Sequence, residues 1–205
     1  MKDIKLWLWL LLFGSLWGIV EVVVGEILFG YDVPYASVWL AVWALFILAV
    51  GRGVMNRAGT STFIGAFAAV FKLVNASPNY CHLLAIFALG LIFDVFSTVL
   101  MKDNRRILLR CSLTGLLSAY GGRAFFALLS TYIMRYEHWV TGGSEYILGH
   151  IFVRGSIAAL ISAAVVPIGY TIGINGEITL KKHPRWAFAG SLVTSVFLWA
   201  LVRIV

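Results

Sequence analysis

The sequence predicts an all-α protein: a polytopic membrane helix bundle of about seven transmembrane helices, with its N-terminus inside. The first observation is composition, since 61% of the 205 residues are hydrophobic and 12% are charged, whereas soluble domains are about half apolar and a quarter charged. The second is a series of apolar stretches, most of them close to the 20 or so residues that a helix needs to cross the hydrocarbon core. The third is a gathering of basic residues in alternate turns.

Seven apolar ranges are the predicted spans, six forming a core and one added at the end, in a single transmembrane domain over residues 1–205. They are 4–30, 33–50, 59–74, 81–101, 107–134, 146–174 and 186–204. Each is expected to be helical, because lipid offers no hydrogen-bond partner to an unpaired backbone group. The second is entered through Pro34, the third is short, and the fifth is expected to break at Gly121 and Gly122.

The basic residues of the turns set the expected orientation. Eleven of the sixteen lie in the N-terminal segment and the turns 51–58, 102–110 and 175–185. The intervening turn 135–145 holds only Arg135, and the turns 31–36 and 75–80 hold none. Basic turns face the cytoplasm, so the N-terminus is predicted inside and the C-terminus outside. Because the positive charge is confined to short turns, we expect the lipid bilayer as the surroundings and no nucleic acid partner.

Apart from the basic residues at the span ends, six charged residues lie inside the predicted spans. They are Glu21, Glu26, Lys72, Asp94, Arg123 and Arg154. One charge near the bilayer centre costs roughly 2.5 to 3.5 kcal/mol even on insertion scales, so such residues are functional or paired by default. Three are acidic and three are basic, which favours at least partial pairing. The sequence leaves open whether Glu21 pairs with Arg123 or with Arg154.

Depth in the predicted spans groups these charges. All except Asp94 fall in the outer half, together with His150, and the outer edge adds Asp32, His82, Tyr31, Tyr35, Tyr80 and Trp139. This layout predicts a polar cavity, rimmed by aromatic residues and open to the outside. The predicted substrate-binding residues are Glu21, Glu26, Lys72, Arg123, His150 and Arg154. The alternative is that these charges form structural ion pairs or extend to the interface along their apolar stems.

Small residues share a helix face with the charges. Gly14, Gly18 and Glu21 follow helical spacing on one stripe, and Gly65 and Ala69 precede Lys72 in the same manner. Small residues allow close approach of membrane helices. We therefore predict that Gly14, Gly18, Gly65 and Ala69 serve helix packing or partner docking, closing the inner half beneath the cavity.

Signatures of catalysis are not found in the sequence. There is no zinc-binding HExxH, no nucleotide-binding GxxxxGK[ST] and no serine in a nucleophile-elbow pattern. Cys81 and Cys111 are far apart and fit no metal or redox spacing. The chain is therefore predicted not to be an enzyme, and to use no cofactor and no metal.

Two segments resemble a known family. The glycine-bearing LFGSLWGIVEVVVG at 12–25 and AFAAVFKLVNASPNY at 66–80 are similar to the substrate-binding membrane subunits (S components) of energy-coupling-factor transporters, and to small membrane proteins like them. The resemblance implies high-affinity binding of a vitamin or micronutrient from outside. It also implies docking, through Gly14 and Gly18, on a transmembrane coupling subunit that carries two ATPases. The family usually has six spans, and the range 186–204 departs from that.

The leading expectation is a membrane subunit that binds a small, polar, anionic micronutrient for uptake with an ATP-driven coupling module. Lys72, Arg123 and Arg154 would suit the anionic group, and Glu21 a cationic or donor group. The alternatives are a secondary, ion-coupled solute transporter and a non-catalytic membrane scaffold or accessory subunit. The expected location is a prokaryotic cytoplasmic (inner) membrane, with several passes.

Overall fold

The computed structural model describes residues 2–75, 80–102, 105–182 and 184–203, and within these ranges the regular structure is helical throughout. Parts of four predicted segments, at 76–79, 103–104, 183 and 204, lie outside them. The all-α fold is confirmed. Four helices are long and apolar enough to cross a membrane: Ile4–Gly30, Ala36–Met55, Tyr80–Leu100 and Gly143–Ile178. The described helices thus fit a membrane bundle, whereas the count of seven spans and the inside N-terminus stay predictions.

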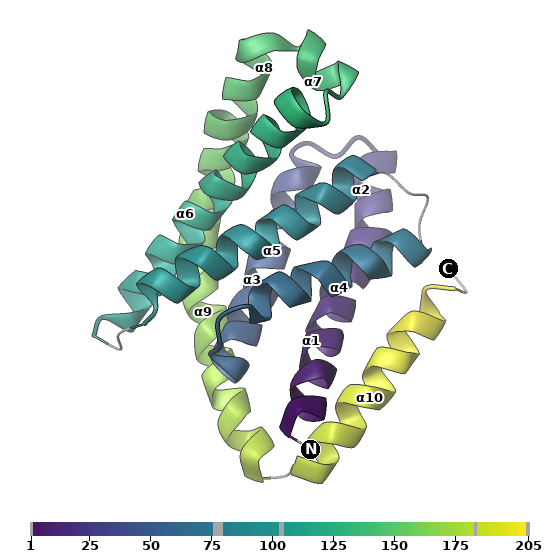
Figure 1. Ribbon diagram of the computed structural model, residues 1–205, viewed down its shortest axis with the longest axis vertical. Helices are drawn as coiled ribbons and strands as arrows, with labels where there is room; N and C mark the ends of the chain where they lie inside the picture. The colour runs from purple at the N-terminus through teal and green to yellow at the C-terminus, as the bar shows by residue number, and fades with distance from the viewer. Residues whose placement is uncertain (1, 76–79, 103–104, 183, 204–205) are drawn as a thin grey trace.

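The helices follow the predicted ranges closely (Figure 1). In chain order they are α1 (Lys2–Ile19), η1 (Val20–Val24), α2 (Gly25–Gly30), α3 (Ala36–Met55), α4 (Thr60–Asn75), α5 (Tyr80–Leu100), α6 (Ile107–Leu128), η2 (Leu129–Ile133), α7 (Glu137–Thr141), α8 (Gly143–Leu148), η3 (Gly149–Arg154), α9 (Gly155–Lys182) and α10 (Pro184–Leu201). The η segments are single π-helical turns: η1 and η3 each join two α-helices, and η2 ends the helix begun by α6. The shorter helices α4 and α10 contain apolar stretches of 10–17 residues.

Two details of the helix boundaries differ from expectation. Helix α6 continues through Gly121 and Gly122 without a break, because these glycines allow close contact with Phe96 and Leu89 of α5. Helix α3 continues past residue 50 to Met55, so that Arg52 is a buried helical residue and not part of a turn.

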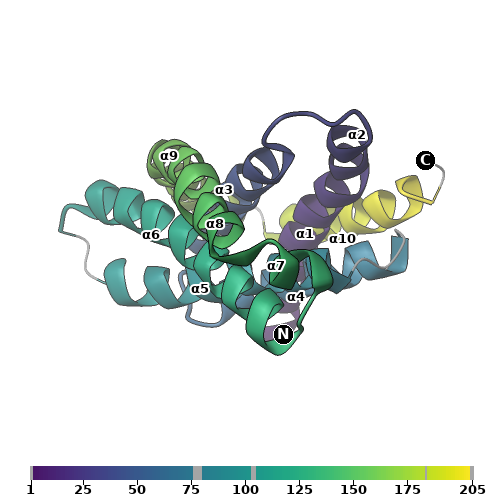
Figure 2. The ribbon, with the colours of Figure 1, turned by 90° about the horizontal axis from the view of Figure 1, so that it is seen from above.

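The helices pack in two neighbouring groups. Helix α9 lies along both α3 and α6, while α4 lies between α1 and α5, and α10 packs on α1. Figure 2, a view from above, shows α6 and α9 on one side of the molecule and α1 and α10 on the other. The short helices α7 and α8 lie at the end of the bundle far from the N-terminus (Figure 1). That end holds the candidate site.

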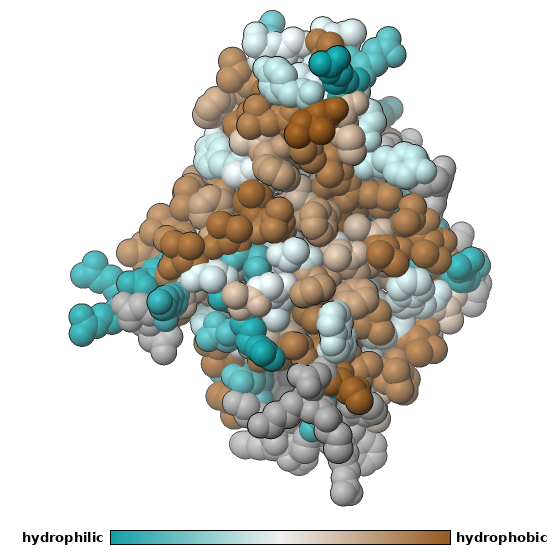
Figure 3. All heavy atoms as spheres, in the orientation of Figure 1, coloured by the Kyte–Doolittle hydropathy of each residue, from teal (hydrophilic) through white to brown (hydrophobic). Residues whose placement is uncertain are grey.

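The outer surface of the bundle is apolar. Large apolar side chains are widely exposed, at 72% for Leu160, 70% for Ile133 and 68% for Val99. Figure 3 shows apolar residues over much of the middle of the visible face, with polar residues toward its ends. Exposure of large apolar side chains on this scale fits lipid contact, because isolated soluble monomers rarely expose wide apolar patches.

The predicted small-residue positions serve helix packing. Gly14 and Gly18 of α1 face Phe67 and Phe71 of α4, and an added Cβ at either glycine would overlap these side chains. Gly65 lies against the backbone of α5 at Gly90. Ala69, at the fourth predicted position, is half-buried and packs on the core. Gly14 and Gly18 are therefore covered by α4 of the same chain.

Further glycines join the second group of helices. A Cβ at Gly173 of α9 would overlap the carbonyl of Val50 of α3, and a Cβ at Gly115 of α6 would overlap the carbonyl of Ser162. The backbones of α3, α6 and α9 thus approach each other with no room for a side chain. These contacts lie between the cavity and the end that holds the α3–α4 turn, and they support a bundle closed at that end.

Candidate functional site

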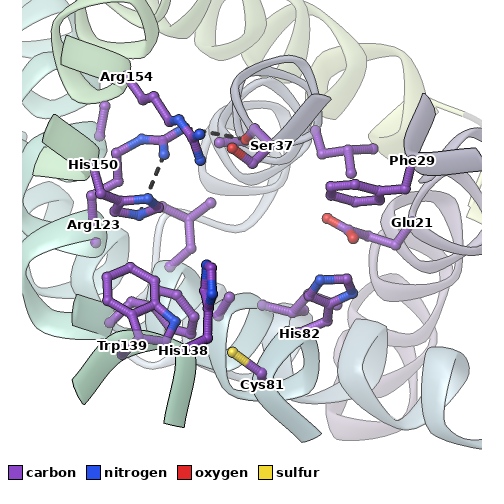
Figure 4. Close-up of a pocket in the computed structure, with 18 of the residues that line it drawn as sticks. Glu21, Phe29, Ser37, Cys81, His82, Arg123, His138, Trp139, His150 and Arg154 are labelled. Atoms are coloured by element: carbon purple, nitrogen blue, oxygen red, sulfur yellow. Dashed lines mark hydrogen bonds between the residues drawn. The ribbon is translucent and has the colours of Figure 1, made fainter. Parts of the chain in front are cut away.

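A cavity of about 330 Å³ lies between the helix ends near α7 and α8 (Figure 4). Its lining comes from α1, η1, α2, α3, α5, α6, α7, α8 and η3. The lining residues are Trp17, Glu21, Phe29, Ser37, Leu40, Ala41, Cys81, His82, Ala85, Ile86, Leu89, Ala119, Gly122, Arg123, Phe126, His138, Trp139, Tyr146, His150 and Arg154. The volume is at the lower end of the range for ligand pockets, so the cavity has the size for one small solute.

Four of the six predicted binding residues line this cavity. They are Glu21, Arg123, His150 and Arg154. Lys72 does not line it but lies behind Glu21. Glu26 is exposed on α2 and outside the lining. The prediction of a binding role for Glu26 therefore finds no support in the cavity.

Two π-helical turns place charged side chains at the cavity. Glu21 lies in η1, while His150 and Arg154 lie in η3. In η1, the N–H of Gly25 donates to the carbonyls of Val20 and Val22 and not to that of Glu21. Single π turns inside α-helices are rare and occur frequently at functional sites. Their presence at this cavity favours a functional role over an ordinary packing gap.

Glu21 pairs with neither arginine that the sequence offered. Its Oε2 lies 3.2 Å from Nζ of Lys72, its Oε1 accepts a 3.2 Å hydrogen bond from Nε1 of Trp17, and its main-chain carbonyl accepts a second bond from Lys72, also 3.2 Å. The ammonium group thus binds both the carboxylate and the main-chain carbonyl of Glu21. Glu21 and Lys72 form a neutral pair in one wall of the cavity, which confirms that the intramembrane charges are paired in part.

Asp94 has a structural role away from the cavity. Its carboxylate accepts hydrogen bonds from the backbone N–H of Gly59, at 2.7 Å, and of Ser61, at 3.3 Å, and lies 3.7 Å from Nη1 of Arg52. Gly59 and Ser61 mark the start of α4, where a negative charge is favourable. Asp94 of α5 therefore caps α4 and fixes it to its neighbour.

Arg123 is a buried cation facing the cavity. Its side chain donates to the carbonyl of Ser37 at 3.3 Å and makes a long 3.5 Å contact with Nε2 of His150, while its Nε has no partner. Only 7% of the residue is exposed. Within the described ranges no carboxylate forms an ion pair with it. Arg154, which is exposed, adds a second positive charge to the same wall.

Aromatic rings lie beside the charged groups on both walls of the cavity. Trp139 of α7 lies edge to face against Phe126, Tyr146 and His150, with ring centroids 5.2, 5.1 and 4.9 Å away. Across the cavity, Phe29 of α2 stacks on His82 of α5 at 5.2 Å. The rings of Trp139 and His82 were expected at the rim, and both line the cavity.

Other expected rim residues lie elsewhere, and several lining residues carry no sequence signal. Asp32, Tyr31, Tyr35 and Tyr80 are exposed and outside the lining. The lining residues that sequence reasoning missed include Trp17, Phe29, Ser37, Cys81, Phe126, His138 and Tyr146. Apolar residues at a span end are too common to single out, so only a helix-by-helix packing arrangement identifies them. Among described residues, no three His, Cys, Asp or Glu side chains converge in a metal-binding group.

Comparison with known proteins finds no match to this chain among protein-family models, curated proteins or solved structures. The resemblance to S components stays a prediction.

Proposed function

We propose that the chain is a membrane subunit that binds a small anionic solute from the outside, in the cavity beside Arg123. The observation that carries the proposal is a buried guanidinium that faces a cavity and has no paired carboxylate in the described part of the chain. Removing an ion from water costs several kcal/mol unless a partner of opposite charge compensates. A bound anion would supply that partner.

The two walls suit the two ends of one solute. An arginine fork matches the planar geometry of a carboxylate or phosphate group. A guanidinium carries five N–H donors, and the contacts of Arg123 with His150 and Ser37 use two of them, while Arg154 lines the same cavity. Across the cavity, Glu21 points toward this wall (Figure 4). Each of its oxygens accepts one side-chain hydrogen bond and retains a lone pair. Glu21 would therefore accept an N–H or O–H of the solute.

Uptake with an ATP-driven coupling module is the second part of the proposal, and it rests on the resemblance. Because α4 covers Gly14 and Gly18, a coupling subunit would need a different surface. A proton-coupled carrier is the alternative. The cap that Asp94 provides to α4 argues against this residue as a proton relay and favours the binding subunit over the carrier.

The test is native mass spectrometry of the protein, grown in rich medium and released from mild detergent, in wild-type, Arg123→Gln and Arg57→Gln forms. Arg57 is exposed and outside the cavity lining, so it controls for loss of one positive charge. We expect a small-molecule adduct in the wild type and in Arg57→Gln, and none in Arg123→Gln. An adduct that persists in Arg123→Gln, or a wild type that carries none, would contradict the proposal.

Reconstitution separates the binding subunit from the carrier. The purified protein alone in liposomes is expected to bind the identified solute without moving it across the bilayer. Transport by the protein alone, driven by an ion gradient, would support the secondary transporter instead. Normal folding of Arg123→Gln with no adduct in any form would support the scaffold.

A further inference from the structure

Resting on the proposed function, we infer that the solute is a small aromatic acid: a flat ring with its carboxylate at Arg123 and a hydrogen-bond donor at the opposite end. The anionic group and the donor follow from the two polar walls. The ring follows from the aromatic side chains that lie beside the polar groups on both walls. Five aromatic side chains and three imidazoles belong to the lining: Trp17, Phe29, Phe126, Trp139, Tyr146, His82, His138 and His150.

One of the two ring walls is tied together by contacts among its own side chains. Trp139 is 5% exposed and touches three other rings edge to face. His138, its neighbour on α7, makes a 3.0 Å hydrogen bond between Nε2 and the hydroxyl of Tyr146 on α8. A wall whose side chains are locked by their own contacts loses little freedom when it binds a ligand, which is how pre-organisation raises affinity.

The opposite wall is the stacked pair of Phe29 and His82. Their rings are tilted by only 22° to one another, and they stand across the cavity from Trp139 (Figure 4). A flat ring between the two walls would have aromatic contacts on both sides. Aromatic pairs contribute beyond the burial of apolar area, by roughly a twofold to tenfold change in affinity for each contact. A saturated ring of similar size would gain burial alone.

The cavity volume favours a small anion. A space of about 330 Å³ is at the lower end of the range for ligand pockets and is small for a phospholipid with its acyl chains. Arg123 and Glu21 lie on opposite sides of the cavity (Figure 4), which suits a ring with its carboxylate at one end and its donor at the other. Because Glu21 is already paired with Lys72, it would accept a neutral donor such as a hydroxyl or an amine N–H, without needing a full positive charge.

The test uses three probes that differ in one property each, measured by isothermal titration calorimetry in mild detergent. They are 4-hydroxybenzoate, the saturated trans-4-hydroxycyclohexanecarboxylate, and the uncharged 4-hydroxybenzamide. We expect saturable binding of 4-hydroxybenzoate. The saturated acid is expected to bind at least about fivefold more weakly, and the amide at least about tenfold more weakly.

Variants assign the preference for the flat ring to the aromatic walls. Trp139→Leu is expected to reduce the ratio of the affinities for the flat and the saturated acid to about one. Phe197→Leu, at an α10 position that is 59% exposed, is the control and is expected to leave this ratio unchanged. If Trp139→Leu fails to fold, Phe29→Leu on the opposite wall, where the side chain is 43% exposed, gives the same readout.

The outcomes separate this inference from the proposed function. Equal affinity for the flat and the saturated acid overturns the aromatic assignment and leaves anion binding intact. An Arg123-dependent adduct of phospholipid mass, or one that contains no aromatic ring, also overturns it. If neither acid binds and the native protein carries no adduct, the proposed function itself is overturned.

Discussion

At the scale of one residue, a substitution of Arg123 is expected to affect solute binding and protein stability differently. Its burial without an ion-pair partner in the described chain costs free energy that the folded protein alone does not recover. We therefore expect the free energy of unfolding of Arg123→Met to lie within about 1 kcal/mol of the wild-type value, or above it. Its affinity for an anionic solute is expected to fall about 10- to 100-fold. Thermal unfolding in detergent, followed by tryptophan emission, measures the first quantity, and calorimetry measures the second.

The opposite result has a clear meaning. If the unfolding temperature of Arg123→Met is many degrees below that of the wild type while solute binding stays unchanged, Arg123 is a structural residue. Its contribution would then come from the hydrogen bond to the Ser37 carbonyl.

The pair of Glu21 and Lys72 behaves differently, because each residue compensates the other. Lys72→Met leaves a buried carboxylate without its cation and also removes the donor to the Glu21 carbonyl. We expect a loss of about 3 to 5 kcal/mol in the free energy of unfolding. The double variant Glu21→Gln with Lys72→Met is expected to recover most of it, since replacement of a whole buried pair is often neutral.

A double-mutant cycle measured by denaturant unfolding in mixed micelles checks this coupling, with Lys5→Met, at an exposed position, as the control. Additive losses from the two single variants would mean that the ion pair contributes nothing beyond its separate side chains.

At the scale of helices, glycine contacts decide how closely the elements approach. A Cβ at Gly173 would overlap the carbonyl of Val50, whereas Gly176, three residues further along the same helix, has no neighbour within 4 Å. We expect Gly173→Ala to destabilise the protein by about 1 to 3 kcal/mol through overpacking. Gly176→Ala is expected to be neutral or stabilising by up to about 1 kcal/mol, because alanine favours a helix.

The same unfolding assay compares the two alanine variants. Similar stabilities for both would show that α3 and α9 can separate at Gly173 without cost, and would remove the argument for a bundle closed at that end.

The elements themselves were largely predictable. Apolar stretches between turn residues located the long helices to within a few residues, since the length and hydropathy of a span are local properties of the sequence. The π turns at Glu21 and at His150 were not predictable, because a π turn is stabilised by tertiary partners such as Lys72, which donates to the carbonyl of Glu21. The break expected at Gly121 was wrong because helix packing outweighed the low helix propensity of glycine.

At the scale of the whole molecule, two cysteines report on access to the cavity. Cys81 lines the cavity and is partly exposed, whereas Cys111 is fully buried. If the cavity opens outward, a membrane-impermeant maleimide added to intact cells labels Cys81 and not Cys111. An excess of the bound solute is expected to slow the labelling several-fold. Labelling after solubilisation in denaturing detergent, where both thiols react, serves as the control.

Labelling of Cys81 only in inverted vesicles would place the cavity on the cytoplasmic side. That result would reverse the predicted orientation and rule out solute capture from outside.

The sequence by itself determined that this chain is apolar and helical, and that Glu21, Arg123, His150 and Arg154 lie toward the same end of the bundle. These properties follow from composition and from the alternation of spans and turns, which are encoded locally. Only the tertiary structure decided which charges are paired. Lys72 reaches Glu21 across 51 positions in the chain, and the amide of Gly59 reaches Asp94 across 35. Such contacts depend on how helices pack side by side, so the ion-pair partners and the aromatic walls of the cavity became apparent only once the helices were placed in space.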